Sequence, residues 1–331
     1  MDKINWGILG AANIAYEELV PAIRRSNNGE LIAIASRNKE KANRFNVSTM
    51  YESYNELLND EKIDAVYIPL PNSLHKEWVI KAMEHKKHVL VEKPATLTKS
   101  DVEEIKDSSE ANDVVFMEAF MYQFHSQHKY VKELLASNEI GNFQYIKAHF
   151  SFLLDNEQDI RLNKELGGGA FWDLGCYGTH AVTQIAGMKP NQVLMMGKVP
   201  EEYDVDTTSV ALFTDENNRT AEVSASFEGS FTDRYEIFGE KGTIKVEYAF
   251  RPDESEKGKG VVKILNYKGH VIDEKVFEDD SYLLQIEHFQ SCIRENKQPI
   301  YNAGHSLEVV TCIESAYNSL KTASKLVTFN L

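Results

Sequence analysis

Cysteine, basic clusters and long apolar runs are scarce in this 331-residue sequence. Its three cysteines are far apart and in no metal-ligand spacing, which argues against a disulfide framework and favours a reducing compartment. Acidic residues number 51 against 36 lysines and arginines, and the formal net charge is −15, so nucleic acid is not an expected partner. No run approaches the ~18 apolar residues of a membrane span. The start, MDKINWGILG, does not have the pattern of a signal peptide, so a cytoplasmic protein is expected.

Short apolar runs alternate with helical patterns over the first 120 residues. Continuous runs such as Ala65–Ile68 and Val89–Val91 are separated by segments with helical spacing. Parallel strands that crossover helices bury on both faces have this pattern. The sequence therefore predicts a Rossmann-like, doubly wound parallel sheet over residues 1–120, the first half of a two-domain α/β and α+β protein.

The pattern changes to a period of two residues from Phe143 onward. In TAEVSASFEG the apolar residues Ala221, Val223, Ala225 and Phe227 share one face. Antiparallel strands with one buried face alternate in this way. Residues 121–331 are expected to form an α+β substrate and oligomerisation domain. It should contain a large, mostly antiparallel open sheet with helices on one face, and the C-terminal helix could pack back on the first domain.

The first predicted strand ends in a degenerate dinucleotide-binding fingerprint. In G-x-G-x-x-G/A, Gly10 and Ala15 match the first and third positions, while Ala12 replaces the glycine that lets backbone approach the pyrophosphate. Backbone N–H groups at the helix N-terminus would still face the phosphates. An ordinary turn rich in small residues is the alternative. The candidate cofactor contacts in this loop are Gly10, Ala11, Ala12, Asn13 and Ile14.

The end of the second predicted strand bears on the choice of cofactor. NAD enzymes place Asp or Glu there to hold the ribose hydroxyls, but this chain has Ser36 and Arg37. No acid repels a 2′-phosphate, Ser36 can donate to it, and Arg37 can pair with it. NADP(H) is therefore favoured, with NAD(H) possible, and the alternative is a surface arginine at the start of a helix.

Three further strands are expected to end in unusual residues at the edge where open α/β sheets bind ligands. DAVYIPL runs into PNSLH, HVLV into EKP, and VVFM into EAF, whereas ordinary turns would use Gly, Asn or Asp. A lysine placed there is expected to point into the ligand cleft. An X-Pro bond can be cis at modest cost, so we predict a cis Lys93–Pro94 bond. The candidate cofactor contacts from these ends are Leu70, Asn72, His75, Glu92 and Lys93.

The densest glycine run, ELGGGAFWDLGCYGTH at 165–180, leads into a predicted helix. Asp173, Tyr177 and His180 follow at intervals of four and three, which place them on one helix face. An acid, a phenol and an imidazole suit a hydrophobic core poorly, and the neighbours AFW and AV are too apolar for a solvated face. This pattern favours a functional site.

Several motifs follow one another in the order of the glucose–fructose oxidoreductase/inositol dehydrogenase (Gfo/Idh/MocA) family: GILGAANIA, PNSLH, HVLVEKPATL, MEAFMYQFHSQ and GGGAFWDLGCYGTHAV. The sequence resembles that family over essentially its whole length, and most resembles the branch with dimeric dihydrodiol dehydrogenase and NADP-dependent D-xylose dehydrogenases. The resemblance implies catalytic roles for Lys93, for Tyr177 as the acid/base, and for Asp173. It also implies NAD(P) in the first domain, substrate at the large sheet, and a homodimer or homotetramer through that sheet's open face.

These residues suggest hydride transfer between nicotinamide and a hydroxyl or carbonyl carbon of a sugar, polyol or dihydrodiol. The phenol of Tyr177 would take the hydroxyl proton. Because a free phenol titrates near ~10, the ammonium of Lys93 would be needed to favour phenolate. Asp173 would bind a substrate hydroxyl or orient its neighbours. The rival hypothesis is a regulatory protein that binds NAD(P) without chemistry, which has no need of both Lys93 and Tyr177.

The remaining candidates have open roles. His180 could contact substrate or make a structural hydrogen bond, and Arg161 could reach the cofactor or substrate or form a surface salt bridge. Phe152 and Trp172 are further candidates for contacts with a carbohydrate-like substrate. No metal site is expected, because His125 and His128 have no evident third ligand.

Overall fold

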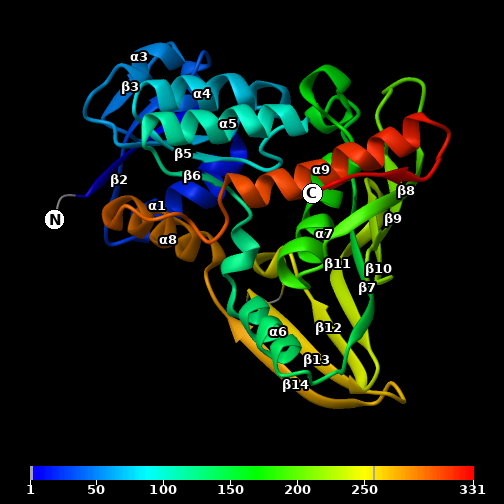
Figure 1. Ribbon diagram of the computed structural model, residues 1–331. Coiled ribbons are helices and arrows are strands. Elements are labelled where there is room, and N and C mark those ends of the chain that lie inside the picture. The colour runs from blue at the N-terminus through cyan, green and yellow to red at the C-terminus, as the bar shows by residue number, and fades with distance from the viewer. Residues whose placement is uncertain (1–2, 256–257) are drawn as a thin grey trace. The chain divides into compact units, whose positions relative to one another are not determined.

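The computed structural model describes residues 3–255 and 258–331, which divide into two compact units (Figure 1). Unit 1 is the chain up to Met121 together with Ser281–Leu307, and unit 2 is Tyr122–Asp280 together with Glu308–Leu331. The sequence predicts one domain over residues 121–331, but the segment Ser281–Leu307 belongs to unit 1. Unit 1 is therefore built from two separate segments of the chain, and most of unit 2 lies between them in the sequence.

Unit 1 is a six-stranded parallel sheet with helices on both faces. Its strands are β1 Ile4–Leu9, β2 Gly29–Ala35, β3 Thr49–Tyr51, β4 Ala65–Ile68, β5 His88–Val91 and β6 Phe116–Glu118. Its helical segments are η1 Ala15–Leu19 (a π-helix), α1 Val20–Arg25, α2 Lys39–Asn43, α3 Tyr54–Leu58, η2 Asn72–Leu74 (a 3₁₀ turn), α4 His75–Glu84, α5 Lys99–Asn112 and α8 Ser281–Glu295.

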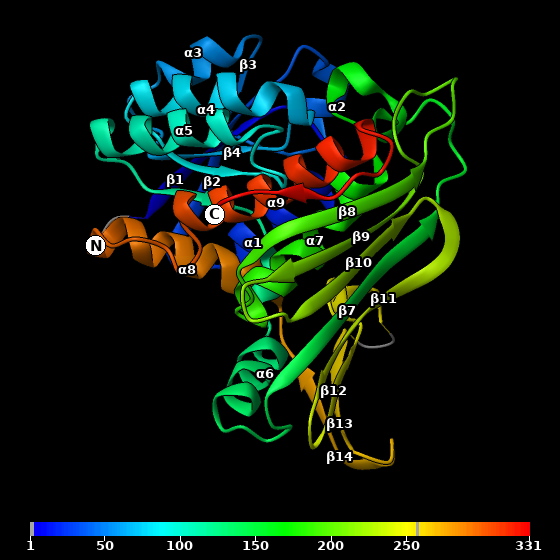
Figure 2. The same ribbon diagram turned by 45° about the vertical axis from the view of Figure 1, so that its right-hand side comes forward.

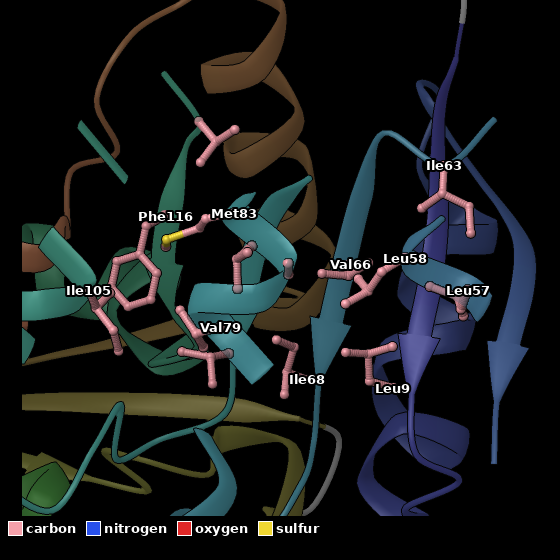
Figure 3. Close-up of a cluster of buried hydrophobic side chains, with 14 of the residues drawn as sticks. Leu9, Leu57, Leu58, Ile63, Val66, Ile68, Val79, Met83, Ile105 and Phe116 are labelled. Atoms are coloured by element: carbon pink, nitrogen blue, oxygen red, sulfur yellow. The ribbon is translucent and has the colours of Figure 1, made fainter. Parts of the chain in front are cut away.

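The strand order β3-β2-β1-β4-β5-β6 is that of a dinucleotide-binding sheet, and it confirms the predicted fold of this part. The continuous apolar strands are buried on both faces, so alternate residues contact different helices. Val66 and Ile68 of β4 point to the cluster formed with α3, α4 and α5, which Figure 3 shows. On the other face Trp6 of β1 packs on Phe289 of α8, with ring centroids 5.4 Å apart.

Unit 2 contains a nine-stranded sheet in the order β14-β13-β12-β11-β7-β10-β9-β8-β15. Its strands are β7 Phe143–Leu153, β8 Pro190–Lys198, β9 Thr208–Asp215, β10 Thr220–Ser226, β11 Glu228–Gly239, β12 Gly242–Glu247, β13 Lys259–Asn266, β14 Val271–Glu278 and β15 Val327–Thr328. Its helical segments are α6 Ser126–Ala136, η4 Ile160–Leu162, η5 Lys164–Leu166, η6 Phe171–Gly175, α7 Cys176–His180, η7 Ala181–Ile185 and η8 Pro252–Glu254. Two segments cross the unit boundaries, η3 Met121–Phe124 and α9 Ala303–Lys321.

The sheet of unit 2 is mostly antiparallel, as predicted, and within this sheet the β7–β10 pair is the only parallel one among the described residues. In Figure 2 the strands β8, β9, β10 and β7 pass in front of α7. Alternation along β9 buries Ala211 and Phe213 on the helix side, while Val210 and Leu212 are exposed on the opposite face. Among the helices of residues 3–255 and 258–331, none combines the length and the hydropathy needed to cross a bilayer.

Candidate active site

The loop after β1 in unit 1 is shaped by a glycine with left-handed backbone. Gly10 has φ of +105°, and a Cβ at this position would lie 2.9 Å from Cδ2 of Leu70. The helix that follows begins at Asn13, directly after Ala12, whose methyl group cannot cap it, so its first N–H groups remain suited to an anion. Ala11, Ala12 and Ile14 are half-buried and Asn13 is exposed. This loop fits the phosphates of a dinucleotide, although Leu70 itself packs against the glycine.

The two residues after β2 differ in their contacts: the side chain of Ser36 is hydrogen-bonded within its turn, whereas that of Arg37 is exposed. The hydroxyl of Ser36 donates to the carbonyl oxygen of Asn38 at 3.3 Å and accepts its N–H at 3.1 Å. Asn38 in turn caps α2 by accepting the N–H of Lys41. Arg37 is exposed. Burial raises the pKa of the nearby Tyr54, and the positive charge of Arg37 acts against that increase. Arg37 is thus the cation at this strand end, and Ser36 shapes the turn that presents it.

His75 joins two of the strand-end loops. It is completely buried, with Nδ1 2.8 Å from the carbonyl oxygen of Pro94 and Nε2 2.8 Å from that of Leu70. Burial lowers the pKa of His75, and the positive charge of Lys93 acts in the same direction. Asn72, by contrast, is half-buried in the turn η2. His75 therefore holds the loops after β4 and β5 together, an arrangement that the PNSLH motif alone did not indicate.

The loop after β5 carries Lys93, and the Lys93–Pro94 bond is cis, which confirms the prediction. Glu92 accepts a hydrogen bond of 2.5 Å from the hydroxyl of Tyr67 on β4 and another from the backbone N–H of Lys93. The side chain of Lys93 is half-buried. The hydroxyl of Tyr67 and the backbone N–H of Lys93 therefore fix the carboxylate of Glu92 beside the lysine.

Glu118, at the end of β6, holds the same loop from the other side. Its Oε1 accepts the N–H of Ala95 at 2.8 Å. Burial raises the pKa of Glu118 to about 7, against the opposing effect of the N–H of Ala95 and of the nearby hydroxyl groups of Ser306 and Tyr301. The motif VVFM-EAF placed Glu118 at a strand end, but nothing in the sequence indicated that its partner is a backbone amide two residues after Lys93.

In unit 2 the three residues predicted to share a helix face lie on one uninterrupted helix. It runs through η6, α7 and η7, so that a short α-helical segment stands between two π-helical ones. π-Helical turns inside helices are frequent at functional sites. Gly178 lets this helix lie close to the sheet, because a Cβ there would be 2.6 Å from Cγ1 of Val223 on β10.

Tyr177 lies in a cage of aromatic rings. Its ring is 5.5 Å from that of Phe150, 5.6 Å from Phe250 and 5.8 Å from Tyr122, and the residue is only 6% exposed. Apolar walls around a phenol exclude water and fix its ring. The sequence did not indicate the contact between Tyr122 and Tyr177, because a tyrosine in a short turn carries no periodic signal.

Asp173, one turn earlier, is paired with Arg161. Nε of Arg161 donates to Oδ2 of Asp173 at 2.7 Å, and its NH1 lies 3.3 Å from Oδ1 of Asp159. Asp173 is the main cause that raises the pKa of Arg161. Arg161 therefore forms a salt bridge, and its partner is the predicted catalytic acid. The pair is partly exposed, so a hydroxyl-rich ligand could still reach it.

The remaining candidates have partners within unit 2. His180 is completely buried, and its Nδ1 lies 2.6 Å from the hydroxyl of Tyr122, which favours the structural role for this histidine. Trp172 stacks on Tyr317 of α9, with ring centroids 5.2 Å apart. Phe152 is half-buried, with its ring 5.6 Å from that of Phe227. Within residues 3–255 and 258–331, no group of three or more His, Cys, Asp or Glu side chains could hold a metal ion.

The structure thus brings the predicted residues together in two sets. In unit 1 these are the ends of β1, β2, β4 and β5, and in unit 2 the helix that carries Asp173, Tyr177 and His180 together with Arg161. The first set fits a dinucleotide, since uncapped helix N–H groups and Arg37 offer partners for phosphates. The second set offers a phenol and a carboxylate to a polar ligand.

Comparisons with known proteins agree with this division. A family model described as "Oxidoreductase family, NAD-binding Rossmann fold" matches residues 4–120, and the "GFO/IDH/MocA C-terminal domain" matches residues 128–245. The chain is 34% identical over 326 residues to D-xylose 1-dehydrogenase (NADP(+)) 2 of Haloferax volcanii, which covers 96% of this chain and 98% of that protein. It is 36% identical over 250 residues to dTDP-3,4-didehydro-2,6-dideoxy-alpha-D-glucose 3-reductase of Saccharopolyspora spinosa, with 74% and 75% covered.

A solved structure is similar over nearly the whole length. It is that of a 3-ketoreductase from Actinomadura kijaniata in complex with NADP and TDP-benzene. The TM-score is 0.90 at 29% sequence identity, and the match covers 97% of this chain and 98% of that chain.

Proposed function

The chain belongs to the GFO/IDH/MocA oxidoreductase family, and on this premise we propose that it transfers hydride between NADP(H) and a hydroxyl or carbonyl carbon of a free sugar. The proposal rests on two chemical groups, an amine and a phenol, that lie in the segments matched by the two family models. Lys93 follows β5 of the dinucleotide-binding sheet. Tyr177 lies on helix α7 of unit 2, where its ring is buried among aromatic side chains.

NADP(H) is the cofactor that this chain's residues favour. The end of β2 offers Arg37 and no carboxylate, so a 2′-phosphate would meet a cation. The xylose dehydrogenase relative is named as an NADP(+) enzyme, and the 3-ketoreductase was solved with NADP. NADPH should therefore bind more tightly than NADH, and Arg37→Ala should reduce that preference about tenfold or more. The exposed Arg25, in the last turn of α1, provides a control of equal charge change.

The proposed chemistry divides between two side chains. A bound nicotinamide would accept the hydride, with both electrons of the C–H bond, from the substrate carbon during oxidation, while Tyr177 takes the hydroxyl proton. During reduction the proton returns from Tyr177 to the carbonyl oxygen. Lys93 provides positive charge that stabilises developing negative charge on that oxygen. Asp173, oriented by Arg161, is available for a substrate hydroxyl.

The charges beside the helix of unit 2 favour an uncharged sugar over a nucleotide sugar. Arg161 is already paired with two carboxylates, and Lys164 is paired with Asp204. Asp155, Glu157, Glu201 and Glu202, in the sequence stretches that contain these partners, add further acids. A diphosphate would meet net negative charge here, whereas the hydroxyls of a free aldose could bind carboxylates. This supports a substrate like that of the xylose dehydrogenase relative rather than that of the dTDP-sugar reductases.

A turnover screen tests the proposal. Purified protein with NADP(+) would be offered D-xylose and other aldoses, polyols and a trans-dihydrodiol, and NADPH oxidation would be followed with a dTDP-keto sugar. Lys93→Met and Tyr177→Phe should each lower kcat about 10²-fold or more while NADPH binding remains. NADPH binding without turnover of any substrate would favour the non-catalytic regulatory hypothesis. Normal turnover in both variants would contradict the proposed chemistry.

A further inference from the structure

The helix that carries Tyr177 is capped by a side chain from a distant part of unit 2. Asp206 lies just before β9 and is 1% exposed. Its Oδ2 accepts the N–H of Phe171, in the first turn of the helix, at 2.9 Å, and its backbone oxygen accepts the N–H of Ala170, the first helical residue, at 2.8 Å. Neither Gly169 nor Ala170 has a side chain that could cap the helix itself, so this function falls to Asp206.

Tyr317 of α9 completes the cap. Its hydroxyl donates to Oδ1 of Asp206 at 2.6 Å and accepts the N–H of Trp172 at 3.2 Å. Ser209 adds a further hydrogen bond, from its hydroxyl to Oδ2 of Asp206, at 2.6 Å. Three consecutive N–H groups, those of residues 170–172, therefore end on Asp206 or on the hydroxyl that Asp206 holds.

The fit around this cap leaves no room for adjustment. Gly169 has φ of +127°, and a Cβ there would lie 2.5 Å from Oδ1 of Asp206 and 2.6 Å from the hydroxyl of Tyr317. Burial raises the pKa of Asp206, while its hydrogen bonds from Ser209, Tyr317 and Phe171 oppose that effect. A buried carboxylate is costly unless it is fully hydrogen-bonded, and the donors of Phe171, Ser209 and Tyr317 meet that requirement for Asp206.

The location of the cap gives it a consequence for chemistry. Asp173 and Tyr177 lie two and six residues after Phe171 on the same helix. A helix whose first turn is released can slide or rotate, and either movement carries the phenol and the carboxylate with it. Displacement of a catalytic group by 1 Å can cost about 10²-fold in rate.

We propose that Asp206 and Tyr317 are positioning residues: they fix the axial and rotational position of the helix that presents Asp173 and Tyr177 to the substrate. This inference rests on the oxidoreductase function proposed above. It assigns no contact with substrate to either residue, and it predicts that their loss slows the hydride step without weakening cofactor binding.

The test uses Asp206→Asn and Tyr317→Phe in the full-length protein. Each changes one hydrogen-bonding group and keeps the shape of the side chain. Asp215→Asn is the matched control, because Asp215 is also a buried carboxylate of unit 2, is bonded to Arg219, and ends the same strand β9. Four quantities are measured: NADPH affinity by fluorescence, kcat and KM for the substrate found in the screen, the primary isotope effect with deuterated NADPH, and the melting temperature.

We expect kcat to fall about 10- to 100-fold in Asp206→Asn and less in Tyr317→Phe, with NADPH affinity within about twofold of the wild type. The isotope effect should rise in both, because hydride transfer becomes more rate-limiting, and the double variant should be little worse than Asp206→Asn since Tyr317 acts through Asp206. Asp215→Asn should lower only the melting temperature.

Three results would overturn the inference. One is a folded Asp206→Asn protein with a lower melting temperature but wild-type kcat and isotope effect, which would make the cap merely structural. If that variant does not fold, Tyr317→Phe decides alone, and wild-type kinetics in it would refute the positioning role. A wild-type protein that binds NADPH but turns over nothing refutes the proposed function first, and the inference with it.

Discussion

Replacing Glu118 by Gln should change how the stability of unit 1 depends on pH. The folded pKa of Glu118 is about 7, raised by burial from its ordinary value of 4.5. Because the folded pKa is above the unfolded one, the protonated carboxyl favours folding at low pH. That contribution is complete below about pH 4.5 and is lost as the pH rises through 7. The difference of 2.5 pH units corresponds to about 3 kcal/mol.

Glutamine resembles the protonated acid, and its carbonyl oxygen can still accept the N–H of Ala95. Urea unfolding of both proteins at pH 5 and pH 8 measures the effect. Between these pH values the wild type should lose up to about 3 kcal/mol more unfolding free energy than Glu118→Gln. Asp233 of unit 2, whose pKa burial also raises to about 7, is present in both proteins and cancels in the difference. Parallel stability curves for the two proteins would refute the reasoning.

Three other changes test the description of unit 2. Gly178→Ala places a Cβ 2.6 Å from Val223, so it should cost about 1–3 kcal/mol in urea unfolding and lower kcat; an unchanged kcat would mean that the helix tolerates displacement from the sheet. Leu212→Glu puts a charge on the open sheet face, where Leu212 is 42% exposed, and should shift the proposed homodimer or homotetramer toward monomer in light scattering. Tyr122→Phe removes the 2.6 Å partner of His180 and should cost about 1–3 kcal/mol, while a change in KM alone would instead return His180 to a substrate role.

The sequence predicts the strand ends of unit 1 well, because continuous apolar strands are easy to separate from amphipathic helices. The position of Lys93 at a strand end follows from that pattern, whereas the cis bond with Pro94 was predicted from the X-Pro dipeptide. The short elements β3 and α3 were not predicted, since a three-residue strand such as Thr49–Tyr51 is too short and too exposed for a periodic signal. The sequence pattern also could not predict that α8 belongs to unit 1, because an amphipathic helix does not indicate which sheet it packs against.

The partners of the site residues were harder to predict than the residues themselves. Spacing placed Asp173 and Tyr177 on one helix face, but it could not distinguish the π-helical turns around them from ordinary α-helix. Arg161 was a candidate with open roles until its contact with Asp173 was known. Asp206 had no signal at all, because a cap that comes from 35 residues away leaves the local sequence of the helix unchanged.

The double entry of the chain into unit 1 has a consequence for its synthesis on the ribosome. When Met121 has been made, all six strands of the parallel sheet exist, but Phe289, the partner of Trp6, has not yet been translated. At translation rates of about 5–20 residues per second, the nascent sheet waits on the order of 10–30 seconds for α8. During that interval the part of the sheet that α8 covers, including Trp6, is without its partner helix, and a chain that ends before residue 281 cannot form a complete unit 1.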